Sequence, residues 1–211
     1  MDLENIRRNY KRSVINFHDL DDDPIVFFKR WLAEAFSIDM LESNACVLST
    51  VSAHNKPSSR VVLLKEIRQN GFVFYTNYKS NKSLDIQNNN NVAINFYWPE
   101  LERQVRVSGK AIKLAPQDSD RYFKSRPRES QLAACLSNQS TEINLDYDVN
   151  VSLNRLAEKF KGKSVDRPVN WGGYCIKADE IEFWQGRPSR FHDRILYVFC
   201  ERKWHKKRLA P

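Results

Sequence analysis

Cysteine is rare in this chain of 211 residues, and no long apolar run is present. The four cysteines, Cys46, Cys135, Cys175 and Cys200, are widely spaced and form no C-x-x-C pair, and the histidines are not clustered. This spacing argues against a zinc site, and a disulfide framework is not expected in a chain of this length. We therefore expect free thiols in a reducing compartment and no bound metal.

Targeting segments and nucleotide-binding motifs are also missing. The first residues, MDLENIRRNYKR, lack the apolar core of a signal peptide, and no apolar stretch approaches membrane-spanning length. We therefore expect a cytoplasmic protein with no membrane partner. The chain has no G-x-G-x-x-G and no Walker sequence, which weakens the case for a nicotinamide or nucleoside-triphosphate enzyme.

Positive charge is what the chain has in excess. Its formal net charge is +8 and its pI is about 9.3. Such a balance indicates an anionic partner, for example nucleic acid, a membrane surface or a phosphorylated small molecule. The aromatic residues lie mainly in expected strands at core spacing and do not alternate with cations as in a platform for nucleic-acid bases. A nucleic-acid partner is therefore not expected.

The chain is expected to form one domain over residues 21–211, preceded by a polar, mobile arm over residues 1–20. The alternative is an arm that becomes ordered over a ligand. Asp23 and Pro24 predict the start of a helix, because Asp caps well and Pro is favoured in the first turn. The apolar stripe expected on this helix consists of Ile25, Phe28, Trp31, Leu32, Ala35 and Phe36.

Short β-type runs begin at Ala45 and predict a meander of antiparallel strands. They read ACVLSTVS, SSRVVLLKEI and FVFYTN, and a short helix over residues 79–90, capped by Ser80, separates them from the strands VAINFYW and ERQVRVSGKAIKLA. Helices are expected from Pro116, over RESQLAACLS and around residues 153–160, before Trp171 returns the chain to β structure. Short turns without alternating helices favour an antiparallel barrel or sandwich over a Rossmann sheet.

The stretch IEFWQGRPSRFHDR, residues 181–194, is the first candidate for chemistry. If the chain is extended after Pro188, Arg190, His192 and Arg194 share one face, because side chains alternate with period two. Asp193 then points to the other face and cannot neutralise them locally. Two guanidiniums and an imidazole near Trp184 suit a flat anionic ligand. A solvated basic edge strand is an equally good interpretation.

Three further groups could bind anions. Arg60 and Lys65 bracket the apolar run RVVLL, expected to be a buried strand, and five residues of spacing place them on opposite faces. Residues 79–83 start a helix with lysines and hydroxyls, which suits a phosphate. Tyr122, Arg126 and Ser130 follow one another at about one helical turn and could form a second phosphate clamp. The corresponding structural alternatives are cations at strand ends, an ordinary surface helix and a Tyr–Arg stack.

Eight motifs then occur in a specific order: RVVLLK, FYTN, LERQVRVSGK, YFKSRPRESQ, SNQS, WGGY, IEFWQGRPSRFHDR and RLAP. In this combination, from about Arg7 to Pro211, the chain resembles the pyridoxamine 5′-phosphate oxidase family. The resemblance implies a mainly β, Greek-key-like antiparallel fold with peripheral helices, the FMN-binding split β-barrel. It also implies a homodimer that holds two flavins between its subunits.

The same resemblance implies that pyridoxamine 5′-phosphate or pyridoxine 5′-phosphate is oxidised to pyridoxal 5′-phosphate, with O2 as acceptor and H2O2 as product. The cofactor would supply the electron sink, and the protein would supply orientation and positive charge. A non-catalytic flavin or pyridoxal-phosphate binding protein on the same barrel stays open as the alternative.

Site residues follow by motif. The resemblance assigns FMN binding to Arg60, Val61, Val62, Leu63, Leu64, Lys65, Tyr75, Thr76, Asn81, Lys82, Gln104, Gln139, Ser140, Trp184 and Arg194. It assigns substrate binding to Arg7, Arg8, Asn9, Tyr10, Lys65, Tyr122, Arg126 and Ser130, and a catalytic place against the pyridine ring to Arg190 and His192. Asn81 departs from the family, which usually has an Arg-Lys pair here, so one flavin-phosphate contact is expected to be lost.

Overall fold

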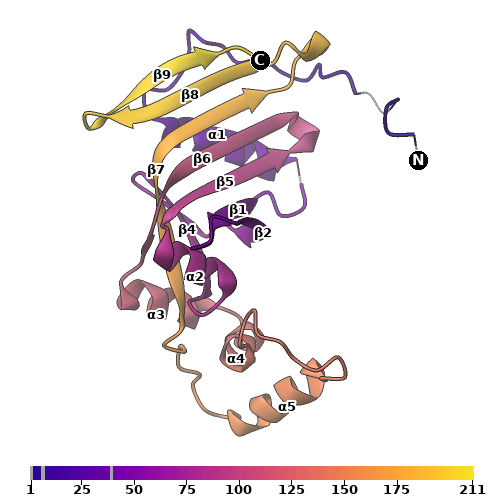
Figure 1. Cartoon of the computed structure of the whole chain (residues 1–211), viewed down its shortest axis with the longest axis vertical. Helices are drawn as coiled ribbons and strands as arrows, with labels where there is room; N and C mark the ends of the chain where they lie inside the picture. Colours follow the sequence, from indigo (N-terminus) through magenta and orange to yellow (C-terminus); the bar gives the residue numbers. More distant parts are fainter. Residues whose placement is uncertain (1, 6–7, 39) are drawn as a thin grey trace.

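Residues with alternating apolar side chains form an antiparallel sheet that curves around a core of aromatic side chains (Figure 1). The structure, a computed structural model, describes residues 2–5, 8–38 and 40–211. Its strands are β1 (Ala45–Val51), β2 (Pro57–Leu63), β3 (Glu66–Arg68), β4 (Gly71–Asn77), β5 (Asn91–Trp98), β6 (Arg103–Lys113), β7 (Trp171–Gln185), β8 (Asp193–Cys200) and β9 (Lys203–Leu209). Its helices are α1 (Pro24–Ser37), α2 (Asn81–Asn88), α3 (Pro116–Ser125), α4 (Arg128–Leu136) and α5 (Val149–Lys159), with short 3-10 turns η1 (Pro99–Leu101) and η2 (Pro188–Arg190).

The strand order is β2-β1-β5-β6-β7-β4-β3, with β8 and β9 continuing from β7. The simple meander expected from the sequence is wrong in one place. The run SSRVVLLKEI divides into β2, which pairs with β1, and β3, which pairs with β4 at the opposite edge of the sheet. The Lys65 N–H donates to the Val73 carbonyl at 2.8 Å, so the end of β2 meets β4 and the sheet curves back on itself. The mainly antiparallel split-barrel prediction is confirmed.

Helix α1 starts as predicted, because the Asp23 side chain accepts a hydrogen bond from the Ile25 N–H at 2.9 Å. Its apolar stripe fills the barrel: the Phe28 ring lies 5.0 Å from Phe72 and 4.9 Å from Phe96, between ring centroids. Burying a side chain of this size contributes roughly 1.5–3 kcal/mol. Phe36, which was assigned to the same stripe, is 57% exposed and does not belong to it.

A second, smaller core lies beneath α3, α4 and α5 and contains Phe123, Leu132, Val165 and Trp171. It fixes these helices at the lower end of β7 in Figure 1. The predicted helices over residues 116–136 and around 153–160 are confirmed.

All four cysteines lie in the described part of the chain and are free thiols. Over residues 2–5, 8–38 and 40–211, no group of three or more His, Cys, Asp or Glu side chains could hold a metal ion. None of the helices in those same segments has both the length and the apolar character to cross a bilayer.

The N-terminal segment contacts the barrel, whereas the sequence favoured a mobile tail over residues 1–20. Ile15 is buried, and its N–H donates to Asp193 at 3.2 Å. The Ser13 carbonyl accepts from the Arg187 guanidinium at 3.2 Å. Residues 10–15 therefore run along the barrel surface. Arg7, one of the expected substrate residues, lies outside the described residues.

Candidate functional site

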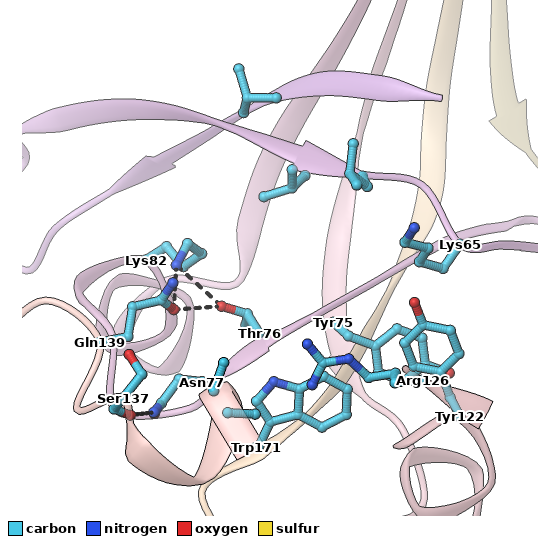
Figure 2. A pocket seen from close by; sticks show the side chains of 15 residues that line it. Lys65, Tyr75, Thr76, Asn77, Lys82, Tyr122, Arg126, Ser137, Gln139 and Trp171 are labelled. Atoms are coloured by element: carbon cyan, nitrogen blue, oxygen red, sulfur yellow. Dashed lines mark hydrogen bonds between the residues drawn. The ribbon is translucent and has the colours of Figure 1, made fainter. Parts of the chain in front are cut away.

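Ten of the expected ligand residues line one cavity between β2, β4, α2, α3 and α4 (Figure 2). Its volume is about 390 Å³. Of the residues assigned to FMN or substrate, those that line it are Val61, Val62, Leu63, Lys65, Tyr75, Thr76, Lys82, Tyr122, Arg126 and Gln139. Leu64 is buried in the barrel core behind this surface. The run RVVLL was expected to be a buried strand, but Val61 is 64% exposed on β2, which is an edge strand of the sheet.

Lys82 forms one corner of the cavity. Its side chain is buried, and its Nζ donates to Gln139 Oε1 at 3.0 Å and to Thr76 Oγ1 at 3.1 Å (Figure 2). It also donates to Ser80 Oγ at 3.1 Å. All three partners are neutral oxygens, and no carboxylate among the described residues forms an ion pair with the ammonium. Burial, and then the nearby Arg60, lower the pKa of Lys82 to about 8. An ammonium held in this way favours an anionic ligand.

The sequence places Lys82 there through the turn that ends β4. The Asn77 carbonyl accepts from the hydroxyls of Ser80 and Ser83 at 2.7 and 2.9 Å, and its side chain accepts from the Lys79 N–H at 2.8 Å. These bonds turn the chain directly into α2. Ser80 stands at the N-cap as predicted, but its side chain makes no capping bond, because the hydroxyl donates back to Asn77. The helix begins at Asn81, two residues later than expected.

Three aromatic rings form the opposite wall. Tyr75 stacks on Tyr122 with ring centroids 3.9 Å apart, and on Trp171 at 5.5 Å. The Arg126 guanidinium lies over the Trp171 ring, 4.6 Å from its centroid. One guanidinium nitrogen, Nη1, is buried without a hydrogen-bond partner, and burial lowers the pKa of Arg126. An orphaned donor in a cavity wall is costly unless a ligand accepts from it.

The predicted trio Tyr122, Arg126 and Ser130 is only partly brought together. Tyr122 and Arg126 line the cavity, and Figure 2 shows Lys65 on the same side of it. Ser130 lies half-buried in α4 and is not part of the lining. Trp171 and Asn77 belong to the lining although no role was assigned to them. Both stand in motifs that had been noted, WGGY and FYTN, and these motifs were the available signal.

Arg60 lies behind the Lys82 corner. It donates to Thr50 Oγ1 at 2.8 Å and to the Leu48 carbonyl at 3.2 Å, and it is not part of the lining. Burial lowers the pKa of Arg60, which Asp85 partly offsets. The N–H of exposed Asn81 donates to Ser140 Oγ at 3.3 Å. Ser140 therefore lies at the N-terminus of α2, near Lys82.

A second group of expected residues is found on β6, β7 and β8. The register pairs Gln104 with Trp184 and Trp184 with Arg194, so these side chains form a row across three strands. Arg194 donates to Glu182 Oε1 at 2.7 Å and to the Ala210 carbonyl at 2.9 Å. The hydrogen bonds to Glu182 raise the pKa of Arg194. Glu182, which the sequence analysis did not single out, balances this cation from the adjacent strand.

His192 joins this row through its ring, whose centroid lies 4.7 Å from Trp184. The Arg187 N–H donates to His192 Nδ1 at 3.1 Å. Burial, and then Arg190, lower the pKa of His192, while Asp193 opposes them. Tyr10, from the N-terminal segment, lies 5.7 Å from both the Trp184 and the His192 rings.

Arg190 does not share a strand face with His192 and Arg194, so the extended chain expected after Pro188 is wrong. Residues 188–190 form the turn η2, Ser189 and Arg190 have φ values of 56° and 59°, and β8 begins only at Asp193. Arg190 is exposed on this turn. Of the remaining expected residues, Arg8 and Asn9 are exposed in the N-terminal segment.

The two groups lie far apart in one chain. Trp171 lines the cavity, and Trp184 follows thirteen residues later on the same strand β7. An extended strand of that length spans roughly 40 Å. The Lys82 group and the His192 group are therefore well separated within one chain.

Two family models match the sequence. One is described as pyridoxamine 5′-phosphate oxidase and matches residues 33–150. The other is described as the pyridoxine 5′-phosphate oxidase C-terminal dimerisation region and matches residues 171–211. Together they include β7 to β9 and most of the cavity lining.

Curated relatives match over nearly their whole length. A pyridoxine/pyridoxamine 5′-phosphate oxidase from Leptospira biflexa is 44% identical over 210 residues, which are 100% of this chain and 99% of the relative. One from Legionella pneumophila is 47% identical over 209 residues, or 99% of this chain and 97% of the relative. One from Actinobacillus pleuropneumoniae is 46% identical over 211 residues and covers both chains fully.

Solved structures share the fold. PhzG from Burkholderia lata, in complex with tetrahydrophenazine-1-carboxylic acid, superposes with a TM-score of 0.90 at 26% identity, over 97% of this chain and 100% of that one. A pyridoxamine 5′-phosphate oxidase-related, FMN binding protein from Nostoc punctiforme superposes with a TM-score of 0.74 at 14% identity, over 91% and 100% of the two chains.

Proposed function

Because this chain belongs to the pyridoxamine 5′-phosphate oxidase family, we propose that it oxidises pyridoxine 5′-phosphate or pyridoxamine 5′-phosphate to pyridoxal 5′-phosphate, with FMN as cofactor and O2 as electron acceptor. The family and the relatives support an oxidase of phosphorylated B6 vitamers. The choice of FMN, the residues that bind it and the homodimer are proposals that stand on the geometry described above.

One observation carries the proposal: the cavity has two separate cationic corners, and within the described residues neither cation is paired with a carboxylate. Lys82 is bonded only to neutral oxygens, and Arg126 keeps one buried nitrogen without a partner. Flavin mononucleotide and a phosphorylated vitamer each carry one phosphate. A site for both needs two places of positive charge with an aromatic surface near them, as the cavity provides.

The Lys82 corner fits the FMN phosphate. Thr76 and Gln139 place a hydroxyl and an amide beside the ammonium, Ser140 lies at the start of α2, and the N-terminal end of this helix adds to the positive potential. Arg60 does not line the cavity, but its positive charge lies close to Lys82 and adds to the potential of this corner. FMN, when bound, accepts the electrons removed from the substrate carbon and passes them to O2, which yields H2O2.

The Arg126 corner fits the substrate phosphate. Arg126 offers its unpaired Nη1, Tyr122 offers a hydroxyl, and Lys65 lies on the same side (Figure 2). The stack of Tyr75, Tyr122 and Trp171 holds this corner rigid, because each ring is fixed by its neighbour. Ser130 would need to approach from α4 to complete the clamp.

The second group of residues would reach this cavity from a second copy of the chain. The outer face of the sheet offers the surface for such a homodimer. In cross-strand order it carries Val61, Val47, Asn95 and Arg106, of which Val61 and Val47 are 64% and 38% exposed and the Asn95 Oδ1 atom is buried without a partner. Tyr97 on the same face is 55% exposed. Apolar side chains beside the site favour contact with another copy.

His192 would serve as a hydrogen-bond donor rather than as a base. Its Nδ1 accepts from the Arg187 N–H, so the neutral ring carries its proton on Nε2. The lowered pKa keeps that neutral form at ordinary pH. Arg190, on the adjacent turn, would place its guanidinium against the substrate ring. Both groups orient and polarise the substrate, and neither needs to form a covalent bond.

The test is the visible spectrum of the purified protein before and after anaerobic addition of pyridoxamine 5′-phosphate. We expect the absorbance of oxidised flavin, its bleaching on addition of the substrate, and its return with H2O2 when air is admitted. A yellow protein that does not bleach with either vitamer phosphate would instead be the non-catalytic binding protein. A colourless protein that gains no flavin on incubation with FMN would contradict the cofactor assignment.

A further inference from the structure

Glu102 occupies an unusual place between η1 and β6. Its backbone is left-handed, with φ at 55°, and the residue is only 6% exposed. Its carbonyl accepts from the Gly186 N–H at 2.7 Å and from Gln185 Nε2 at 3.2 Å. Glu102 is thereby fixed to the end of β7, directly before the segment that carries Arg190 and His192.

The Glu102 carboxylate faces the N-terminal segment. Its Oε2 accepts from the N–H groups of both Lys11 and Arg12, each at 2.9 Å. The Arg8 guanidinium lies 3.9 Å from its Oε1. Hydrogen bonds to a buried carboxylate are among the stronger ones in proteins, because the charged acceptor has lost its water. Two backbone donors at adjacent positions fix the course of the chain, whatever the side chains of residues 11 and 12 are.

Fixing residues 11 and 12 also fixes Tyr10. Its Cγ and Cβ lie so close to Gly186 that a Cβ added there would be 2.7 and 3.0 Å from them, so the Tyr10 side chain lies directly on the glycine backbone. The ring meets Trp184 edge to face at a centroid distance of 5.7 Å and lies at the same distance from His192. A side chain at position 186 would displace it.

We propose that Glu102 is a positioning residue of the oxidase: its carboxylate anchors residues 11 and 12 and so holds Tyr10 against His192. The role in catalysis rests on the proposed function, whereas the anchoring does not. Without the anchor, the N-terminal segment must become ordered each time the substrate binds. The conformational entropy lost in this ordering opposes substrate binding. Loss of the anchor therefore weakens substrate affinity and leaves flavin binding and the chemical step largely unchanged.

The anchoring is tested by limited trypsin digestion of the holoenzyme. The bond after Arg12 is protected while the Arg12 N–H is held. We expect Glu102→Gln, which keeps the shape and removes the charge, to speed cleavage there about tenfold, as loss of a charge-assisted bond predicts. Glu100→Gln, the same change at an exposed position of the same turn, should leave the rate unchanged. Equal cleavage rates in all three proteins would overturn the proposal.

A variant on the arm side covers the case in which Glu102→Gln does not fold. Lys11 is exposed, and Lys11→Pro removes one of the two N–H donors without touching the barrel. It should also expose the bond after Arg12, and unchanged protection in this variant would equally contradict the anchor.

The positioning role is tested by steady-state kinetics. We expect Glu102→Gln to raise KM for pyridoxine 5′-phosphate about tenfold, with kcat within about twofold of wild type and FMN content unchanged. If Glu102 acts through Tyr10, adding Glu102→Gln to Tyr10→Ala should not raise KM further. If the two substitutions raise KM by factors that multiply in the double variant, Glu102 acts by another route. If the wild-type protein oxidises neither vitamer, the proposed function fails, yet the trypsin result still decides the anchor.

Discussion

Lys82 should make the apoprotein less stable at neutral pH than it is at alkaline pH. Burial and Arg60 shift its pKa from an ordinary value of 10.5 to about 8, which means that the fold disfavours the charged form. Between these two pKa values the unfolded chain binds more protons than the folded one. The free energy of unfolding therefore rises with pH in this window, and the penalty is largest below about pH 8.

The magnitude follows from the size of the shift. One pKa unit corresponds to about 1.4 kcal/mol, so the charged Lys82 costs the apoprotein about 3 kcal/mol near neutral pH. At about pH 10 most of this cost is gone, because the folded amine is then neutral. The contribution of Lys82 to the free energy of unfolding should therefore change by about 2.5 kcal/mol between about pH 7 and pH 10.

The variant Lys82→Met isolates this effect. Urea unfolding of the apoprotein, wild type and variant, would be measured at about pH 7 and pH 10. The absolute difference in unfolding free energy also contains the three lost hydrogen bonds, so the informative quantity is its change with pH. We expect wild type to gain about 2.5 kcal/mol on the variant over this interval. Lys79→Met, at an exposed lysine three residues away, is the matched control and should show no such gain.

The same variant, Lys82→Met, should bind FMN more weakly. A charge-assisted bond to the phosphate contributes roughly 1.5–3 kcal/mol, so Kd should rise about tenfold to a hundredfold. A stability difference between wild type and Lys82→Met that is constant over pH would refute the reasoning, because it would mean that the ammonium is solvated in the apoprotein. FMN binding that is unaffected would place the phosphate elsewhere.

Three further outcomes are expected. Arg190→Ala should depress kcat/KM while the FMN content stays nearly intact, because Arg190 is exposed on η2 and is proposed to contact the substrate ring and not the flavin phosphate; apoprotein from this change would contradict the assignment. Sedimentation of dilute holoprotein should give about twice the chain mass of 24.8 kDa, and a monomer with full FMN content and activity would rule out the shared site. Asn81→Arg should tighten FMN binding by about 1 kcal/mol, less at high salt, and an unchanged Kd at low salt in a fluorescence titration would mean that residue 81 faces away from the phosphate.

Local signals predicted much of the fold. Asp23 and Pro24 located the start of α1, and Pro99 the break between β5 and β6, because capping and proline geometry depend on adjacent residues alone. The division of SSRVVLLKEI into β2 and β3 was not predictable in the same way. A continuous apolar run reads as one strand, and the separation at Leu64–Lys65 arises only when each half finds a different partner.

The candidate site shows the same limit. Motif order identified the lysine, tyrosine and arginine side chains that line the cavity, but not the partners that set their charge. Glu182 neutralises Arg194 from the adjacent strand, and Glu102 anchors a segment about ninety residues away in sequence. Both depend on strand register and chain path. The positive φ at Arg190 likewise follows from η2, which an alternating pattern could not indicate.

The distance between the Lys82 group and the His192 group within one chain has a genetic consequence. In a homodimer whose sites each combine the Lys82 group of one chain with the His192 group of the other, the two halves can be inactivated on separate alleles. A chain damaged at Lys82 and a chain damaged at Arg190 would each be inactive alone. Paired with one another, they would form one site that carries both lesions and one that carries neither, so two defective alleles in the same cell would restore part of the activity that each has lost.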